Sequence, residues 1–465
     1  MVFDRMAEDQ SSWPRIRIGD VAQVYDGPHA TPTKTATGPI FLGISALNRG
    51  RLDLANTEHL SEEDFSKWTK RVVPSASDVV FSYETRIGEA AIIPKGLRCC
   101  LGRRMGLVRV DASRLDPHFF LYQYLSPTFQ GFLHSRTIHG STVDRIALKD
   151  FPDFEIDLPP LTVQRQIAKV MLDLDAKIDL NRRINQTLEA MAQAIFKSWF
   201  VDFDPVKAKI AAIEQGENPL RAAMRAISGK TDAELDQMPR EHHAQLAATA
   251  ALFPDEMQDS ELGEIPKGWK VKPLSEFLTI KRGGSPRPIQ EFMAPKGLPW
   301  VKIADATAEA SPFLFRTKEF IKETGLKKTV YLQSGSLILT NSATPGLPKF
   351  LELDACIHDG WLYFPEKKLF SDQYLYLLFQ TIRAELVAQG NGSVFTNLKT
   401  DILKAQRVIA PSELIMKAFT AAVKPMFLGI RAKTVERQQM SELRDTLLPK
   451  LLSGELSVAD VEIPA

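Results

Sequence analysis

Apolar residues along this chain follow two different spacings, and stretches of the two kinds alternate. Short apolar runs bounded by Gly, Pro and Ser, such as 78–81 and 337–340, predict β-strands. Two aromatic-rich stretches, 118–124 and 373–379, predict short helices. Short strands mixed with short helices are typical of an α/β or α+β domain.

Two longer stretches, 161–203 and 412–452, carry apolar residues three or four positions apart. That spacing forms one stripe on a helix and is close to the seam of a coiled coil. Asn181 and Asn185 interrupt the first stripe, and Thr434 and Arg437 interrupt the second. About 40 residues of helix extend roughly 60 Å, and an apolar stripe of that length needs a partner. We expect the stripes to pair through Ile167, Leu174, Ile178, Leu188, Ile195, Trp199, Phe419, Met426, Ile430, Leu447 and Leu451.

The chain also repeats itself once. Residues 13–31 resemble residues 269–287, which lie 256 positions later, and Gly38–Ile44 resembles Gly297–Ile303. Further matches follow in the same order, among them Ser77–Ser82 with Gly335–Thr340 and Gly140-Ser141 with Gly392-Ser393. Identity is low, but the matches fall at apolar and turn positions. We therefore favour a true repeat over chance similarity between two α/β domains.

The repeat and the stripes together predict how the chain is divided. Pro159-Pro160 and Pro411 precede the two long helices and allow them to begin. The expected parts are an N-terminal tail (1–12), a first repeated domain (13–157), a long helix (158–203), an acidic segment without counterpart (204–268), a second repeated domain (269–410), a second long helix (411–452) and a C-terminal tail (453–465).

Composition adds little until charge is counted by region. The 465 residues are 44% hydrophobic and 25% charged, which fits an ordinary soluble protein of two or three domains. The formal net charge of +1 predicts no partner. By region, however, residues 204–268 hold seven basic and twelve acidic side chains, whereas residues 269–410 hold nineteen and thirteen. The second repeated domain is therefore basic. The first is nearly balanced, with eighteen basic and seventeen acidic residues.

Three features indicate the compartment. Cys99, Cys100 and Cys356 cannot form a disulfide framework or a CxxC metal site. The first thirteen residues are charged and lack the apolar core of a signal peptide. No stretch of about 18 uncharged apolar residues could span a membrane. We expect a cytoplasmic protein without a membrane partner.

No motif for catalysis or for a metal stands out. Ser228–Thr231 resembles the end of a phosphate-binding loop, but Met224 replaces the required glycine, so a turn between surface helices is the better interpretation. His242-His243 has no further ligand at metal-binding spacing. The carboxylate pairs Asp202/Asp204 and Glu155/Asp157 lack the lysine of a nuclease site and are expected to end secondary-structure elements. We expect no catalytic residue, no metal and no cofactor bound by this chain.

Three loop regions recur in both repeated domains and carry groups that suit nucleic acid. They lie at 25–34 and 281–287, at 83–88 and 341–346, and at 139–142 and 391–395. Glycines allow a close backbone approach, basic side chains suit phosphate, and Arg86 and Asn341 have the geometry to bind guanine and adenine. The candidate DNA-binding residues are Lys34, Arg86, His139, Ser141, Thr142, Lys281, Arg282, Arg287, Asn341, Thr344, Lys349, Asn391 and Ser393. Any one such loop is more often a plain turn. Their recurrence with different side chains suggests that each copy recognises a different short target.

Three further segments carry a specific resemblance. Residues 196–206 (FKSWFVDFDPV), 261–269 (ELGEIPKGW) and 443–455 (LRDTLLPKLLSGE) resemble the DNA-specificity subunit of type I restriction-modification systems. Leu158–Leu161 followed by Gln164 is similar to the start of that family's central helix. Two departures are visible: Val163 stands where the family commonly has Glu, and Pro411–Leu414 lacks the Pro-Pro pair and the Gln.

The resemblance implies an architecture and a function. Two target-recognition domains would be held apart by two antiparallel helices in a pseudo-twofold arrangement, and each domain would recognise one half of a split, asymmetric target in double-stranded DNA. The helices would set the spacer and dock the partner subunits. Two modification subunits with S-adenosylmethionine and two restriction subunits with ATP and Mg²⁺ would supply the chemistry.

Three alternatives remain. The chain could be a purely structural scaffold, or a specificity subunit that serves a methyltransferase alone. A self-contained nuclease is disfavoured by the missing carboxylate–lysine set.

Overall fold

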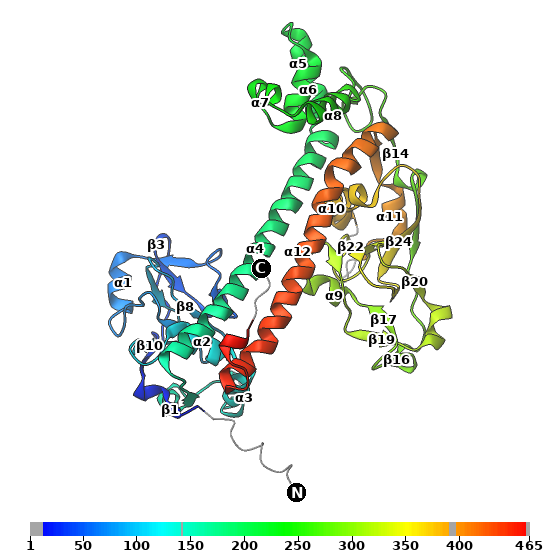
Figure 1. Ribbon diagram of the computed structural model, residues 1–465. Helices are drawn as coiled ribbons and strands as arrows, with labels where there is room; N and C mark the ends of the chain where they lie inside the picture. Colours follow the sequence, from blue (N-terminus) through cyan, green and yellow to red (C-terminus); the bar gives the residue numbers. More distant parts are fainter. Residues whose placement is uncertain (1–12, 141–142, 390–396, 462–465) are drawn as a thin grey trace. The chain divides into compact units, whose positions relative to one another are not determined.

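The computed structural model describes residues 13–140, 143–389 and 397–461. The chain forms two compact units, one of Met1–Leu180 with Glu436–Ala465 and the other of Asn181–Val435 (Figure 1). Each unit contains one repeated domain and one part of each long helix. Both β-sheets and α-helices build the units, as the sequence predicts.

The first repeated domain contains two small sheets. The first has the strand order β2-β10-β7-β8: Ala22–Asp26, Met105–Val110, Val79–Ser82 and Ala90–Ile92. The second has the order β6-β3-β9: Glu58–Leu60, Lys34–Leu42 and Cys99–Leu101. A short hairpin, β4 (Leu47–Asn48) with β5 (Arg51–Leu52), and helices α1 (Glu62–Trp68), α2 (Pro117–Leu125) and α3 (Pro127–Ser135) complete it. Strands β1 (Arg15–Arg17) and β11 (Glu155–Asp157) pair where the chain enters and leaves the domain.

The second repeated domain has the same plan with additional strands. Its first sheet has the order β15-β24-β21-β22-β18: Leu278–Arg282, Trp361–Lys367, Leu337–Thr340, Pro348–Leu351 and Phe313–Leu314. Its second has the order β16-β19-β17-β23-β20: Met293–Ala294, Glu319–Ile321, Leu298–Val301, Ala355–Ile357 and Val330–Leu332. Helices α9 (Ile303–Ala308), α10 (Asp372–Gln389) and α11 (Thr400–Ala405) accompany the sheets, and β14 (Lys270–Pro273) pairs with β25 (Arg407–Ala410).

The matching strand orders confirm that the repeat is structural. In both domains the second sheet has a parallel pair at the same place, β3 with β9 and β17 with β23. The first sheet of the second domain has a further parallel pair, β18 with β22. The aligned glycines Gly38 and Gly297 both have positive φ angles, +122° and +152°, and both lie against a backbone carbonyl of the neighbouring strand, that of Leu60 or Ile321. A side chain is excluded there by strain and by space. The repeat therefore preserves backbone geometry more strictly than side-chain identity.

The two predicted long helices are α4 (Leu161–Phe200) and α12 (Glu413–Ser453) (Figure 1). They run antiparallel. In the first unit the N-terminal half of α4 contacts the C-terminal part of α12, with Arg444 Nη1 lying 2.8 Å from Asp175 Oδ1. In the second unit the C-terminal half of α4 contacts the start of α12, with ring centroids of Phe196 and Phe419 6.1 Å apart.

The predicted stripe residues are all buried or half-buried, but they do not serve the helix pair alone. Ile167 and Leu174 share a core with the first repeated domain, and Phe419 packs against Tyr374 of the second. Each stripe is therefore covered partly by the other helix and partly by a domain.

Asn181, Asn185 and Thr434, three of the four polar interruptions of the stripes, lie in the second unit. Asn185 Nδ2 donates to Thr434 Oγ1 at 3.0 Å, and Thr434 also lies 3.1 Å from Ser311 Oγ. Asn181 is buried, and its amide has no hydrogen-bond partner among the described residues. Buried polar groups of this kind disfavour other registers of a helix pair.

The acidic segment folds into four helices: α5 (Asp204–Glu214), α6 (Pro219–Ser228), α7 (Asp232–Asp236) and α8 (Arg240–Ala251). A short hairpin follows, β12 (Met257–Gln258) with β13 (Ile265–Pro266). The helices are not merely surface helices, because Ala223, Met224, Leu235 and Ala250 form a small core of their own.

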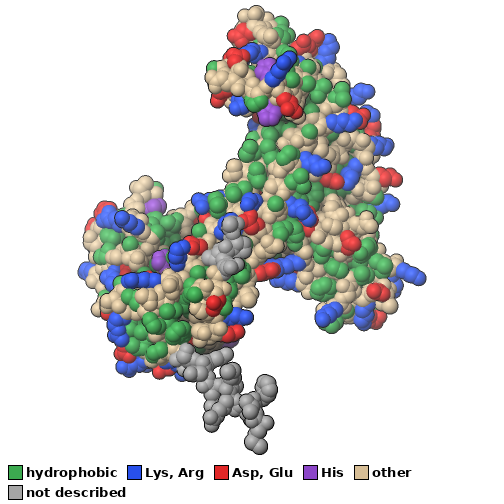
Figure 2. Space-filling view, in the orientation of Figure 1, with side chains coloured by type: hydrophobic (Ala, Val, Ile, Leu, Met, Phe, Trp, Pro, Cys, Tyr) green, Lys and Arg blue, Asp and Glu red, His purple; other side chains and the backbone are tan. Residues whose placement is uncertain are grey.

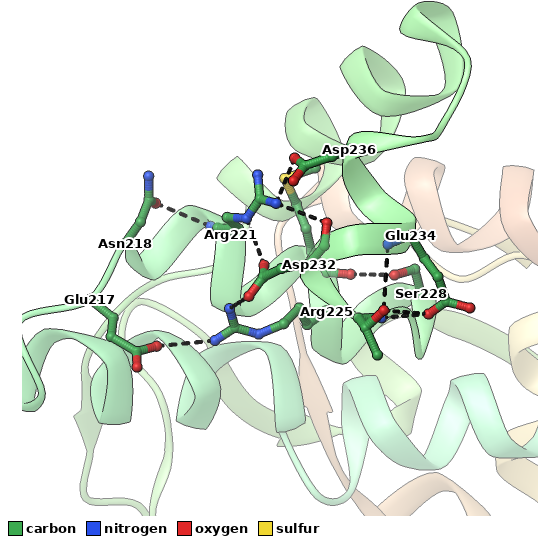
Figure 3. A network of polar contacts seen from close by, with 10 residues as sticks. Glu217, Asn218, Arg221, Arg225, Ser228, Asp232, Glu234 and Asp236 are labelled. Atoms are coloured by element: carbon green, nitrogen blue, oxygen red, sulfur yellow. Dashed lines mark hydrogen bonds and ion pairs between the residues drawn. The ribbon is translucent and has the colours of Figure 1, made fainter.

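Part of the acidic excess of this segment is used internally. Arg221 and Arg225 both bind Asp232, at 2.6 Å and 2.8 Å, and Arg225 also binds Glu217 (Figure 3). Ser228–Thr231 is a turn, as predicted: Gly229 ends α6 with φ +67°, and Thr231 caps α7. The segment is thus a compact helical insertion.

The short predicted elements are present with small differences. Strand 337–340 has the predicted limits and strand 78–81 is β7, one residue later. Stretch 118–124 lies in α2, whereas 373–379 is only the first part of the longer α10. The pair Asp202/Asp204 flanks the junction of α4 and α5. Asp157 is the last residue of β11, as expected, whereas Glu155 is its first.

Candidate nucleic-acid interface

One glycine in each repeated domain brings the first candidate loop against the sheet. Gly27 follows β2 and donates its N–H to Met105 O at 2.9 Å, and Gly283 follows β15 and donates to Trp361 O at 2.9 Å. A Cβ at Gly27 would lie 2.7 Å from the same Met105 oxygen, and one at Gly283 would lie closer still to His358 O. Only glycine lets the chain pass so near.

The turn that these glycines contact joins β9 to β10 in one domain and β23 to β24 in the other. It consists of Gly102–Arg104 in the first domain and of His358–Gly360 in the second. The second candidate loop also meets it, since Tyr83 N donates to Arg104 O at 3.3 Å and Asn341 N donates to Gly360 O at 2.9 Å. Two of the three candidate loops therefore meet at one turn in each domain.

In the first domain a cation of the turn meets carboxylates of the loops. Arg104 Nε lies 2.9 Å from Glu84 Oε2, and Arg104 Nη1 donates to Thr85 Oγ1 at 3.1 Å. Tyr83 OH donates to Asp26 Oδ1 at 2.9 Å, and burial, reinforced by this carboxylate, raises the pKa of Tyr83. The neighbouring Arg103 is exposed.

The third loop reaches the same place in the first domain. Thr85 N donates to Asp144 O at 3.3 Å, and Asp144 pairs with His139 at 3.2 Å. The side chain of His139 is exposed. In this domain all three candidate loops therefore converge.

In the second domain the charges are reversed, because the turn carries the carboxylate of Asp359. Ser285 Oγ donates to Asp359 Oδ1 at 2.6 Å, and Arg287 Nη2 lies 3.4 Å from Oδ2. The backbone carbonyl of Asp359 accepts hydrogen bonds from Arg282 Nε and from Asn341 Nδ2. The hydrogen bond from Ser285 is the main cause of a lowered pKa of Asp359.

His358 is the half-buried imidazole of this turn. Its Nδ1 accepts the Gly360 N–H at 2.8 Å, while its Nε2 has no partner among the described residues. Burial lowers the pKa of His358 to about 4. The imidazole is therefore neutral at pH 7, and it supports the turn by accepting the Gly360 N–H.

The remaining predicted residues of the first domain lie at or near the surface. Lys34 is exposed and pairs with Glu58. Arg86 is half-exposed and already engaged, since it donates to Ile44 O at 3.2 Å and pairs with Glu89 at 3.1 Å. Ser141 and Thr142 lie outside the described residues.

The predicted residues of the second domain divide into exposed and buried ones. Lys281, Arg282 and Arg287 are exposed, the first two at the end of β15 and the third in the loop that follows it, and Thr344 is half-exposed. Asn391 and Ser393 lie outside the described residues. Asn341 and Lys349, by contrast, are each only 3% exposed.

The burial of Asn341 and Lys349 corrects their prediction as DNA-binding residues. Lys349 donates its ammonium group to the backbone carbonyls of Glu309 (2.6 Å) and Ser311 (2.5 Å), and burial lowers its pKa to about 8. Asn341 holds the Asp359 turn through its amide nitrogen. Both side chains are structural in this conformation and are not presented to DNA.

Sequence reasoning missed a group of cations beside the first loop of the first domain. A pocket of about 440 Å³ lies next to Gly27 and is lined in part by His29, Trp68, Lys70 and Arg71. Arg71 pairs with Asp26 at 3.5 Å, and Lys70 is exposed. The signal was present, because Lys70-Arg71 directly follows an aromatic residue and a threonine in the sequence. Aligning residues 101–105 with 357–361 would likewise have revealed the turn.

Other kinds of site are not supported by the described part of the chain. Within residues 13–140, 143–389 and 397–461, no three His, Cys, Asp or Glu residues are grouped as a metal site. None of the described helices is long and apolar enough to cross a membrane.

Comparison with known proteins identifies the domains. The model of the type I restriction modification DNA specificity domain matches residues 10–190 and 266–417, which together are more than half of the chain. The chain belongs to this DNA-specificity family. The two matched segments contain the two repeated domains, so the DNA-specificity domain occurs here twice.

Individual relatives agree with the family. The specificity subunit of the type I restriction enzyme HindI from Haemophilus influenzae is 32% identical over 377 residues, covering 75% of this chain and 80% of that protein. The MjaIX specificity subunit from Methanocaldococcus jannaschii is 24% identical, covering 97% and 94%. The crystal structure of the S subunit of a type I restriction-modification system from M. genitalium has a similar fold, with a TM-score of 0.56, 14% identity and coverage of 96% and 98%.

Proposed function

We propose that this DNA-specificity chain recognises a bipartite, asymmetric sequence in double-stranded DNA, with one half bound by each repeated domain. The observation that carries the proposal is the turn that both domains share with opposite charge. Both domains have the same strand order and the same backbone contacts around this turn, but Arg103-Arg104 of one domain is replaced by Asp359-Gly360 in the other. Two domains with the same backbone contacts and different side chains suit two different half-sites.

The helices would join the two domains and receive the partner subunits. Each of α4 and α12 has residues in both compact units. Apolar side chains remain exposed along them, namely Leu172, Leu180, Met191, Leu414 and Leu428. Exposed apolar residues on otherwise paired helices support docking of further helices. We assign these contacts to the modification subunits.

Catalysis would belong to the partners. The relatives are named specificity subunits of type I restriction enzymes, which supports a complex in which this chain provides the target sequence and the scaffold. Two modification subunits would methylate adenine with S-adenosylmethionine, and two restriction subunits would use ATP and Mg²⁺. This chain would contribute neither a catalytic residue nor a cofactor, and it would act in the cytoplasm.

A complex with methyltransferase activity alone is the second candidate. It predicts a modification-subunit gene next to the gene for this chain and no gene for an ATP-driven nuclease. Sequencing the neighbouring genes distinguishes the two complexes directly.

The decisive experiment changes the distance between half-sites. Four residues inserted after Asn181 in α4 and after Val435 in α12 lengthen the antiparallel pair by about 6 Å, close to two base-pair steps. Sequencing of methylated DNA from a host that carries the complete system should show both half-sequences unchanged and one or two additional unspecified bases between them.

A matched control separates helix length from chain length. Four residues inserted after Gly229 enlarge the turn between α6 and α7 and should leave the spacer unchanged. If the paired helix insertion folds and methylates DNA with the original spacer, the helices do not set the spacing.

A further inference from the structure

The carboxylate of Asp359 lies against Ser285 and Arg287 of the loop that we expect to bind DNA phosphates. Ser285 donates to one of its oxygens at 2.6 Å, and Arg287 lies 3.4 Å from the other. A hydroxyl and a guanidinium around one oxyanion are also the groups that bind a phosphate. The Arg287 side chain is 79% exposed, so a phosphate can approach it without a change in the fold.

The same loop carries a cation that is not compensated in this way. Lys281 is exposed, and in the described part of the chain its side chain makes no ion pair or hydrogen bond. Of the three cations in residues 281–287, Lys281 is free within the described residues, Arg287 pairs with the Asp359 carboxylate, and Arg282 donates to the Asp359 carbonyl. In the first domain the position of Asp359 is taken by Arg103, so this internal pairing is specific to the second domain.

We propose that Asp359 is a specificity-determining positioning residue, whose carboxylate holds Arg287 back from DNA until a correctly placed phosphate replaces it. The proposal rests on the DNA-recognition function proposed above. On non-target DNA the domain makes loose backbone contacts, and a neutralised arginine adds little to them. On the target, base contacts fix the domain and place one phosphate against Arg287.

The physical consequence is a different salt dependence on the two kinds of DNA. Each phosphate contact contributes about 0.9 to the slope of log K against log salt concentration. Arg287 should contribute to that slope on the target and not on other sequences. Removal of the Asp359 charge should release Arg287 for any phosphate.

The test uses the full chain co-expressed with its modification subunits and two labelled duplexes. One duplex carries the methylated motif found by sequencing, and the other has the half-sequence of the second domain scrambled. For D359N, the slope on the scrambled duplex should become steeper by about 0.9 and that on the target should stay unchanged. Discrimination between the duplexes should fall several-fold. Because Asn retains an oxygen that accepts from Ser285, the loop should remain folded, which thermal unfolding checks.

Two further variants make the result specific. D354N removes a carboxylate of the same domain, and the oxygens of that carboxylate accept hydrogen bonds from Ser334 N and Tyr331 OH. It should change binding to the two duplexes equally. R287A should flatten the salt slope for the target duplex by about 0.9 and leave the slope for the scrambled duplex unchanged.

The outcomes are distinguishable. A D359N protein that behaves like D354N, or an R287A protein with an unchanged slope on the target, overturns the role of Asp359. A wild-type complex that binds both duplexes equally overturns the proposed DNA recognition itself, whatever the variants do.

Discussion

The two repeated domains differ most where their backbones agree best. Gly102–Arg104 and His358–Gly360 form the same turn, accept the same backbone hydrogen bonds and face the same loop glycine. Yet the first turn is cationic and is held by Glu84, while the second is anionic and is held by Ser285 and Arg287. The difference shows that the shared backbone geometry depends on main-chain contacts, which leaves the side chains of the turn free to differ between the domains.

The largest expected difference between the domains concerns acid stability. The pKa of His358 is about 4 in the fold against an ordinary value of 6.5, because the imidazole is buried, although Asp359 opposes the shift. A lowered histidine pKa gives stability that is complete above pH 6.5 and is lost as the pH falls towards 4. The loss reaches about 3 kcal/mol in the free energy of unfolding at pH 4 and is roughly half as large at pH 5.5. Hydrogen exchange at pH 7.5 and 5.5 should show the second domain losing protection first.

The first domain supplies the control, since Gly102 stands where the second domain has His358. His358→Asn keeps an acceptor for the Gly360 N–H and should abolish the difference between the domains over this pH range. Equal loss of protection in the wild-type domains would show that His358 does not titrate as described.

A smaller difference between the domains is expected from the equivalent glycines. Gly27→Ala and Gly283→Ala each place a methyl group against a backbone carbonyl and should cost about 1–3 kcal/mol of stability. Gly283→Ala should cost more, because the opposing carbonyl is closer. Thermal unfolding and hydrogen exchange measure the loss for each domain. Gly131→Ala, which meets nothing within 4 Å, is the matched control and should be neutral or slightly stabilising. A Gly27→Ala protein as stable as this control would contradict the equivalence of the two loops.

The smallest effect concerns single phosphate contacts. Lys281 and Arg103 are exposed cations at the two loop–turn junctions, and neither side chain makes a bond within the described residues. Lys281→Ala and Arg103→Ala should each weaken binding to all sequences alike and flatten the salt slope by about 0.9. Arg282 is less suitable for this measurement, because its side chain also holds the Asp359 carbonyl. Fluorescence anisotropy at several salt concentrations gives the slope, and an unchanged slope for either variant excludes that residue from the interface.

Much of the fold was predictable because it depends on apolar spacing. The two stripes give α4 and α12 to within a few residues, and the run at 337–340 gives β21 with its limits. The repeat was detectable because glycines such as Gly38 and Gly297 are required by backbone geometry. These features are local or periodic, so they remain visible in one sequence.

The candidate site was predictable only in part. Lys349 looks like a surface cation in the sequence, but the carbonyls that bind its ammonium group come from residues about forty positions away. Asn341 likewise bonds to a turn that only the fold brings near. Asp359 was missed because a carboxylate does not suggest DNA binding until its contacts with Ser285 and Arg287 are known. Such long-range polar contacts have no periodic signature.

The strand pairs at which each repeated domain begins and ends have a consequence for recombination of the gene. β1 pairs with β11, and β14 pairs with β25, so each domain begins and ends at a single seam beside the start of a long helix. A gene segment that encodes all residues between two such paired strands could be exchanged for a segment that encodes another domain with the same backbone, without altering α4 or α12. New combinations of the proposed half-sites could then arise by recombination in one step, while the helix surfaces to which we assign the modification subunits remain unchanged.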